Sequence, residues 1–314
     1  MTAQGTSSPV DYPAGAGPMP EISGVAVEHE FYDLPSGRFH VARAGDRSLP
    51  AIMLVHGFPQ HWWSWRGVVQ ELASEAHLIM PDLRGSGWSS VPTEKGSYRK
   101  SDMAADLAGL LDAMEIDQIA IASHDWGAFL SQILAVDAPE RVSRLLALSI
   151  APPIPVKRPP LRSAARMYYQ LVFSAPGSSK LMFRNTAFFA RGLRQDVQQK
   201  RAFTHEDALV FARPYADPTR AQAAQLMYRS FVMGDAAALM KRMKGKRFTM
   251  PVRFVLSKFD AYIPPEFAQS ALGLGPQVQA IVQDRTGHFL PDEDPAYTAE
   301  QIREFLLPAA KPVS

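Results

Sequence analysis

Three side chains of this sequence could together carry out covalent catalysis. Asp125, Asp260 and His288 each lie in a polar turn that follows a short apolar stretch. A carboxylate can attack carbon and form an ester, and an imidazole can then activate the water that cleaves this ester. A second carboxylate can orient the imidazole. We therefore take Asp125 as the candidate nucleophile, His288 as the candidate general base and Asp260 as the orienting acid.

The residues around Asp125 predict how this side chain is presented. The apolar run that begins at Ile119 predicts a buried strand, and the residues after Asp125 can continue as a helix. A strand that turns sharply into a helix needs small neighbours, and Ser123, Gly127 and Ala128 supply them. The residue at the apex of such a turn points outward beside a helix N-terminus.

Strands and helices alternate along most of the chain, which predicts an α/β fold with a largely parallel sheet and helices on both faces. Residues 25–44 predict an antiparallel hairpin at a sheet edge. We expect further strands at 51–55, 77–80, 119–124, 142–150, 252–256 and 278–282. We expect helices at 62–72, 265–272 and 296–307. A further helix is expected to be capped by Ser101 and to run to residue 114, and another is expected to follow the turn at Asp125 and to end before Pro139.

The pattern changes at Pro152, and no strand is expected before about residue 248. Helical runs are expected there at 163–173, 195–203, 207–215 and 219–231. We interpret residues 152–248 as a helical cap inserted between two parts of one core, 25–151 and 249–314. Residues 1–24 are rich in Pro, Gly, Ala and Ser and are expected to form a flexible leader.

Composition excludes several classes of function. The 314 residues contain 46% hydrophobic residues and no cysteine, and the formal net charge is +2. No thiolate can act as nucleophile or metal ligand, and no apolar run approaches the length of a membrane span. The absence of a secretion signal and of a long basic run predicts a cytoplasmic protein that binds no nucleic acid. No residues have metal-ligand spacing, and the glycines at 85 and 87 lack a nucleotide-binding pattern, so no metal or cofactor is expected.

Five segments of this chain form a recognisable set: His56-Gly57-Phe58-Pro59, Arg84-Gly85-Ser86-Gly87-Trp88-Ser89, His124-Asp125-Trp126-Gly127, Asp260 and Gly287-His288-Phe289. The candidate catalytic residues among them follow the order nucleophile, acid, histidine. These segments resemble the motifs of the α/β-hydrolase superfamily, and specifically of its epoxide hydrolase branch, and the order is that of the triad in the superfamily. The resemblance implies an α/β-hydrolase fold with an inserted helical cap.

The resemblance also implies a hydrolase that converts an epoxide and water to a vicinal diol. Asp125 would form a covalent ester with an sp³ carbon, and water activated by His288 and Asp260 would hydrolyse it. The backbone N–H groups of Phe58 and Trp126 are the candidate oxyanion hole. In this family the peptide bond before the proline of the first motif is cis, so Phe58–Pro59 is expected to be cis.

An opening epoxide ring needs a donor for its oxygen, and family members place two tyrosine hydroxyls in the cap for this purpose. Tyr228 matches the second donor, because Arg229 follows it as in the family. Tyr169 is the preferred candidate for the first donor, with Tyr168 as the alternative. The side chains of Phe58, Trp126 and Phe289 are expected to line an apolar substrate pocket.

Two other functions compete with this interpretation. A haloalkane or haloacid dehalogenase would use the same triad, but Phe58 stands where haloalkane dehalogenases usually carry a side-chain donor for halide. Trp126 replaces the arginine with which fluoroacetate dehalogenases bind a carboxylate. A non-catalytic ligand-binding protein of this fold is disfavoured by the complete triad. The expected partner is a small apolar epoxide, the expected assembly is a monomer or a homodimer, and the particular epoxide and its stereochemistry are left open.

Overall fold

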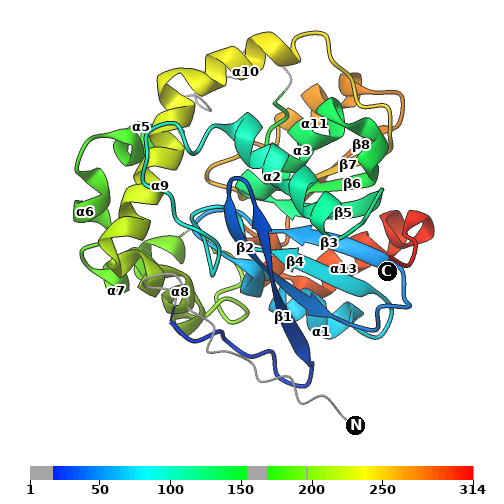
Figure 1. Ribbon diagram of the computed structural model, residues 1–314, viewed down its shortest axis with the longest axis horizontal. Helices are drawn as coiled ribbons and strands as arrows, with labels where there is room; N and C mark the ends of the chain where they lie inside the picture. The colour runs from blue at the N-terminus through cyan, green and yellow to red at the C-terminus, as the bar shows by residue number, and fades with distance from the viewer. Residues whose placement is uncertain (1–16, 154–167, 196, 314) are drawn as a thin grey trace.

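The computed structural model describes residues 17–153, 168–195 and 197–313, and its centre is an eight-stranded sheet (Figure 1). The strand order is β1-β2-β4-β3-β5-β6-β7-β8. The strands are β1 (Val27–Leu34), β2 (Gly37–Ala44), β3 (Ala51–Val55), β4 (His77–Pro81), β5 (Ile119–His124), β6 (Val142–Leu148), β7 (Val252–Ser257) and β8 (Val278–Gln283). The hairpin β1–β2 and the β2–β4 pair are antiparallel, and every other pair is parallel. The prediction of a mostly parallel α/β sheet is confirmed.

The central strands are apolar along their whole length because both faces of the sheet are covered. In β3, Met53 and Val55 belong to the core on one face, whereas Ile52 and Leu54 belong to the core on the other. This alternation is the two-residue period of a strand buried on both sides.

Helices cover the two faces, as Figure 1 shows. One face carries α2 (Lys100–Ala113), α3 (Asp125–Asp137) and α11 (Phe267–Ala271), and the other carries α1 (Arg66–Leu72) and α13 (Pro295–Phe305). Shorter helical turns are η1 (Trp62–Trp65), η2 (Pro139–Arg141), η5 (Leu272–Leu274), α12 (Leu290–Glu293) and η6 (Leu307–Ala309). The sheet is thus held between two layers, and the polar ends of its strands are left for the loops that carry the motifs.

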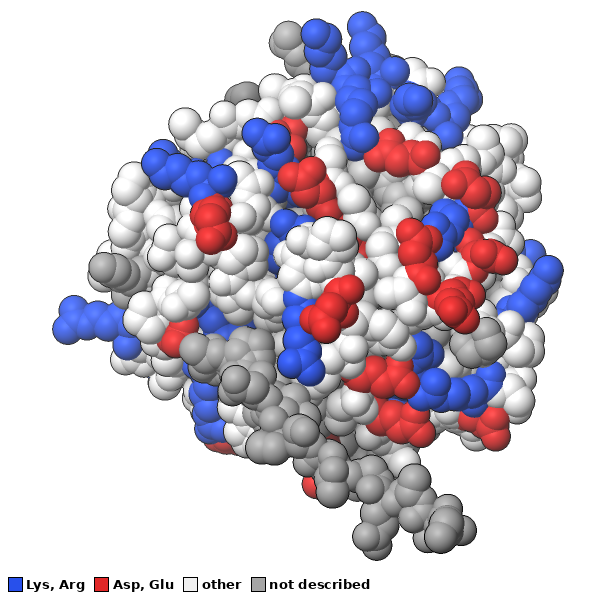
Figure 2. All heavy atoms as spheres, viewed as in Figure 1, with Lys and Arg blue, Asp and Glu red and all other residues white. Residues whose placement is uncertain are grey.

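A helical region is inserted between β6 and β7, and it lies beside the sheet in green to yellow in Figure 1. Its helices are α5 (Tyr168–Ser174), α6 (Ser178–Met182), α7 (Thr186–Leu193), α8 (His205–Ala212), η3 (Arg213–Ala216), α9 (Pro218–Ser230), the π-helical turn η4 (Phe231–Asp235) and α10 (Ala236–Met243). Figure 2 shows basic side chains gathered where α10 ends, while both charge signs mix elsewhere on that face. In the sequence, five basic residues stand at the end of α10 and directly after it: Lys241, Arg242, Lys244, Lys246 and Arg247.

Two local predictions in this chain are wrong. The described residues between 195 and 203 form turns and no helix, because the backbone N–H groups of Gln198 and Gln199 donate to the Glu293 carboxylate at 2.7 and 3.1 Å. The helix expected to be capped by Ser101 begins at Lys100, so Ser101 lies inside its first turn. The N–H of Lys100 donates to the distant Asp235 carboxylate at 2.7 Å, so a residue of the insertion takes the capping role.

Candidate active site

The turn from β5 into α3 holds Asp125 in a left-handed backbone conformation, with φ of 49°. A residue with a side chain adopts this conformation rarely, and it stays there because the surroundings leave no alternative. A Cβ added to Gly127 would overlap the carbonyl oxygens of Val55 and His56, so only glycine lets α3 pack this close to β3. The backbone therefore presents Asp125 at the carboxyl end of the central strands, where sites of open α/β sheets lie.

The loop after β3 contacts the Asp125 carboxylate directly. The backbone N–H of Phe58 donates to Oδ1 of Asp125 at 2.8 Å, and the Phe58–Pro59 peptide is cis, as expected. Gly57 has no room for a side chain, because a Cβ there would overlap the Asp125 carboxyl group. The loop thus fixes one of the two carboxylate oxygens, Oδ1.

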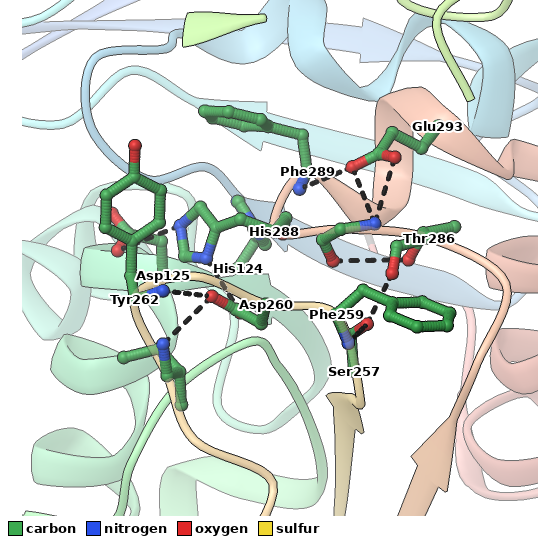
Figure 3. Close-up of polar contacts among 12 residues, drawn as sticks. His124, Asp125, Ser257, Phe259, Asp260, Tyr262, Thr286, His288, Phe289 and Glu293 are labelled. Carbon is green, nitrogen blue, oxygen red and sulfur yellow. Dashed lines mark hydrogen bonds and ion pairs between the residues drawn. The ribbon is translucent and has the colours of Figure 1, made fainter. Parts of the chain in front are cut away.

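His288 lies between the two carboxylates, as Figure 3 shows. Its Nδ1 is 2.9 Å from Oδ2 of Asp260, and its Nε2 is 3.5 Å from Oδ2 of Asp125. Oδ1 of Asp260 accepts hydrogen bonds from the backbone N–H groups of Tyr262 and Ile263 at 2.8 and 2.9 Å. One carboxylate oxygen therefore holds the turn after β7 while the other faces the imidazole.

A second set of polar contacts holds the loop of His288 in place (Figure 3). The buried Glu293 carboxylate accepts hydrogen bonds from the N–H groups of Gly287 and Phe289, each at 3.0 to 3.1 Å. Nε2 of His124 donates to the carbonyl oxygen of His288 at 2.8 Å. Burial and the neighbouring charge of His288 lower the pKa of His124 to about 4, so the ring stays neutral at ordinary pH. Glu293 was not among the residues predicted from the sequence.

The electrostatics of the trio favour an ionised nucleophile. Burial alone would raise the pKa of Asp125, but the hydrogen bond and the charge of His288, together with the Trp126 N–H, lower it below its usual value. Burial would lower the pKa of His288, but the charge of Asp260 and the carboxylate of Asp125 together raise it to about 10. A buried carboxylate held by its neighbours in the charged form is a site suited to nucleophilic attack.

A cavity of about 450 Å³ lies above these residues. Asp125 and His288 form its polar floor, and its remaining wall is predominantly apolar. The lining residues are Phe58, Pro59, Phe173, Met182, Phe188, Phe189, Gly192, Leu193, Gln195, Tyr228, Ala261, Tyr262 and Phe289, together with Asp125 and His288. Such a cavity, with few polar groups in an apolar wall, is the usual form of a small-molecule site.

The predicted pocket residues occupy different places. Phe58 and Phe289 line the cavity, but Trp126 does not. The indole of Trp126 is buried behind the Tyr228 ring, 5.7 Å from it between centroids, and Phe231 covers it at 5.0 Å. The expectation that the Trp126 side chain lines the pocket is therefore corrected, while its backbone N–H stays beside Asp125.

The predicted cap tyrosines are placed in part. The ring of Tyr228 lines the cavity and lies edge-on to Phe58 at 5.3 Å. The backbones of Tyr168 and Tyr169 begin α5, but their side chains lie outside the described part of the structure. Tyr262, which the sequence analysis did not single out, also lines the cavity and packs edge-on against His288 at 4.9 Å. It follows Asp260 by only two residues, and this spacing was the available signal.

Within the described ranges, no group of three or more His, Cys, Asp or Glu side chains could hold a metal ion. Over the same ranges, none of the helices has the length and apolar character needed to cross a bilayer.

Residues 50–295 match a family model described as alpha/beta hydrolase fold. This chain belongs to the α/β-hydrolase family. The matched range includes Asp125, Asp260 and His288 as well as the helices inserted between β6 and β7.

Two curated relatives of this α/β hydrolase match along most of their length. The AB hydrolase superfamily protein YfhM of Bacillus subtilis (strain 168) is 28% identical over 288 residues, covering 89% of this chain and 98% of the relative. The soluble epoxide hydrolase of Corynebacterium sp. (strain C12) is 27% identical over 287 residues, covering 86% and 94%. The solved structure of an epoxide hydrolase called CorEH matches this chain with a TM-score of 0.80 at 24% sequence identity. The match covers 90% of this chain and 99% of the CorEH chain, so the two share the fold.

Proposed function

We propose that this α/β hydrolase converts an epoxide and water to a vicinal diol through an ester on Asp125. One observation carries the proposal: the two oxygens of the buried Asp125 carboxylate have different surroundings. Oδ1 accepts the Phe58 N–H at 2.8 Å, whereas Oδ2 lies 3.5 Å from Nε2 of His288. Oδ2 is therefore the oxygen available to attack, and Oδ1 is the oxygen that becomes the ester carbonyl.

In the first step Oδ2 of Asp125 bonds to a ring carbon while the bond from that carbon to the ring oxygen breaks. The released alkoxide takes a proton, and the Tyr228 hydroxyl is the proposed donor, because neutral phenols stay protonated near neutral pH. Tyr169, with Tyr168 as the alternative, is the proposed second donor. We also propose that residues 152–248 form one cap that places these tyrosines over the nucleophile.

In the second step His288 removes a proton from water, and the water oxygen attacks the ester carbonyl carbon of Asp125. The negative charge on Oδ1 is then stabilised by the N–H groups of Phe58 and Trp126. Collapse breaks the bond between the carbonyl carbon and the former Oδ2, which leaves as part of the diol. The proton that His288 took from water passes to this departing oxygen, and the second proton of the water restores the tyrosine hydroxyl. Esterification removes the Asp125 charge that helps to raise the pKa of His288. The pKa of His288 therefore falls as the intermediate forms, and the neutral imidazole can accept a proton from water.

Two further features support the proposal. The epoxide hydrolases named above resemble this chain over 86% or more of its length. The cavity wall is predominantly apolar, which favours an apolar epoxide. Water is the only co-substrate that the proposed chemistry needs.

A paired assay tests the proposal. The enzyme is given an aryl or alkyl epoxide, and in parallel a chloroalkane or bromoalkane of similar size. Diol from the epoxide without halide from the haloalkane is the expected result. Halide release without diol formation would assign the same triad to a dehalogenase. If neither the epoxide nor the haloalkane gives a product, the proposal that this chain hydrolyses these substrates through Asp125 is overturned.

A further inference from the structure

A lysine is buried where the core meets the inserted helices. Lys100 is the first residue of α2, and its side chain is fully buried. Its Nζ donates to the carbonyl oxygens of Tyr98 at 3.0 Å and of Met227 at 2.9 Å. Met227 belongs to α9 and directly precedes Tyr228. A core side chain therefore holds the backbone of the turn of α9 from which Tyr228 projects.

The end of α9 is built to receive this lysine. In a continuous α-helix the N–H of Phe231 would donate to the Met227 carbonyl, but here it donates to the Tyr228 carbonyl, and the π-helical turn that follows is kinked at Gly234, whose backbone is not helical. The Met227 carbonyl thus loses its α-helical donor, and Nζ of Lys100 takes its place. At the far end of the π-helical turn, the Asp235 carboxylate accepts the backbone N–H of Lys100 at 2.7 Å. Residue 100 therefore contacts α9 one turn before η4 and also the last residue of η4.

The same ammonium group contacts the nucleophile side of the site. Nζ of Lys100 lies 4.7 Å from the centre of the Trp126 ring, a cation–π distance, and Trp126 directly follows Asp125. The Trp126 ring in turn packs edge-on against Tyr228 at 5.7 Å. The buried Lys100 side chain thus contacts both the residue after Asp125 and the helix that carries Tyr228.

The ammonium group is costly at this position. Burial lowers the pKa of Lys100 to about 7, with the charge of Asp235 acting in the opposite direction. An apolar side chain of the same length would avoid this cost of desolvation, so packing alone does not explain a lysine here.

We propose that Lys100 is a positioning residue that sets the depth of Tyr228 over Asp125 by joining the Met227 carbonyl to the Trp126 ring. The inference rests on the proposed function. It assigns Lys100 to ring opening, in which Tyr228 donates a proton, and not to ester hydrolysis, in which His288 and Asp260 act.

The experiment separates the two steps. In the His288→Gln background the ester accumulates, and the rate of adduct formation measured by intact mass reports ring opening alone. Lys100→Met, Tyr228→Phe and the combination of both are compared in that background. Lys241→Met, which changes an exposed lysine of α10, is the matched control. Hydrolysis of the ester is followed separately by single turnover with His288 intact.

We expect Lys100→Met to slow ring opening about tenfold and ester hydrolysis less than twofold, because displacement of a donor by a fraction of an ångström affects only the step it serves. In the Tyr228→Phe background, the same change should slow ring opening less than twofold. Equal slowing in both backgrounds, or equal slowing of both steps, would overturn the proposal.

A second variant covers the case in which Lys100→Met does not fold. Asp235→Ala releases the other end of the π-helical turn, and it should slow ring opening in the same Tyr228-dependent manner; unchanged ring opening would overturn the proposal. Failure of the proposed function is recognised separately, because the unmodified enzyme would then yield no diol and His288→Gln would yield no adduct.

Discussion

The backbone N–H of Phe58 donates a hydrogen bond of 2.8 Å to Oδ1 of Asp125, and this bond makes the two oxygens of the carboxylate unequal. Oδ2 faces Nε2 of His288 at 3.5 Å and is the oxygen that we propose attacks the substrate carbon. Since Phe58 belongs to the loop after β3 and Asp125 to the turn after β5, the parallel pairing of these strands brings the donor and the carboxylate together.

Substitution of Gly57 by alanine should disable the site while leaving the protein folded. The new methyl group would overlap the Asp125 carboxyl group, so either the nucleophile or the loop of Phe58 must move. We expect kcat/KM to fall by about 10²-fold or more, since misplacement of reacting groups by 1 Å has this effect. The expected loss of stability is about 2 kcal/mol, typical of overpacking.

Steady-state kinetics and thermal unfolding measure the two effects. Gly273→Ala is the matched control, because no atom lies within 4 Å of a Cβ added there. Near-normal activity of Gly57→Ala would contradict the close contact between this loop and the nucleophile.

Replacement of Asp260 by asparagine should arrest the reaction at the ester. An asparagine oxygen can still accept the N–H groups of Tyr262 and Ile263, but the amide nitrogen then faces Nδ1 of His288 and favours the wrong tautomer. We expect ester hydrolysis to slow by about 10³-fold or more, as in other triads, and ester formation to change little. Rapid-quench mass spectrometry should find the ester as the main enzyme species. A slowed first step with no accumulated ester would show that Asp260 acts on Asp125 and not through His288.

The fraction of enzyme present as ester should rise as pH falls. The lowered pKa of Asp125 keeps this carboxylate ionised below its usual range, so ring opening continues in mild acid. Ester hydrolysis needs neutral His288, and lower pH protonates it, so the second step slows first. Quenched samples at pH ~5 and pH ~8 should contain more ester at the lower value. A smaller ester fraction at the lower pH would contradict the assignment of His288 as the base.

The sequence allowed the core of the site to be predicted because each of its residues follows a buried strand. Asp125, Asp260 and His288 come after apolar runs whose parallel arrangement places their carboxyl ends at one edge. Gly127 was identifiable because a sharp turn between a strand and a helix requires small residues. These signals are local, and the fold brings their loops together without further information.

The insertion was predicted less well, because long-range contacts decide its local structure. The described residues between 195 and 203 do not form the expected helix, since Glu293 of the core binds the N–H groups that a helix would have used. The helices α6, α7 and α10 were not predicted. Trp126 was expected in the pocket wall, but Phe231 and Tyr228, far along the chain, cover it. Contacts of this kind leave no periodic pattern in the sequence.

The mass of the His288→Gln enzyme after exposure to an epoxide tests the central claim most directly. The claim is that Asp125 attacks the epoxide and that His288 is needed only to release the product. The predicted result is an adduct heavier than the enzyme by the mass of the epoxide, located on the peptide that contains Asp125 and absent from the Asp125→Asn, His288→Gln double variant. An unmodified His288→Gln enzyme, under conditions in which the unaltered protein forms diol, would contradict the covalent account.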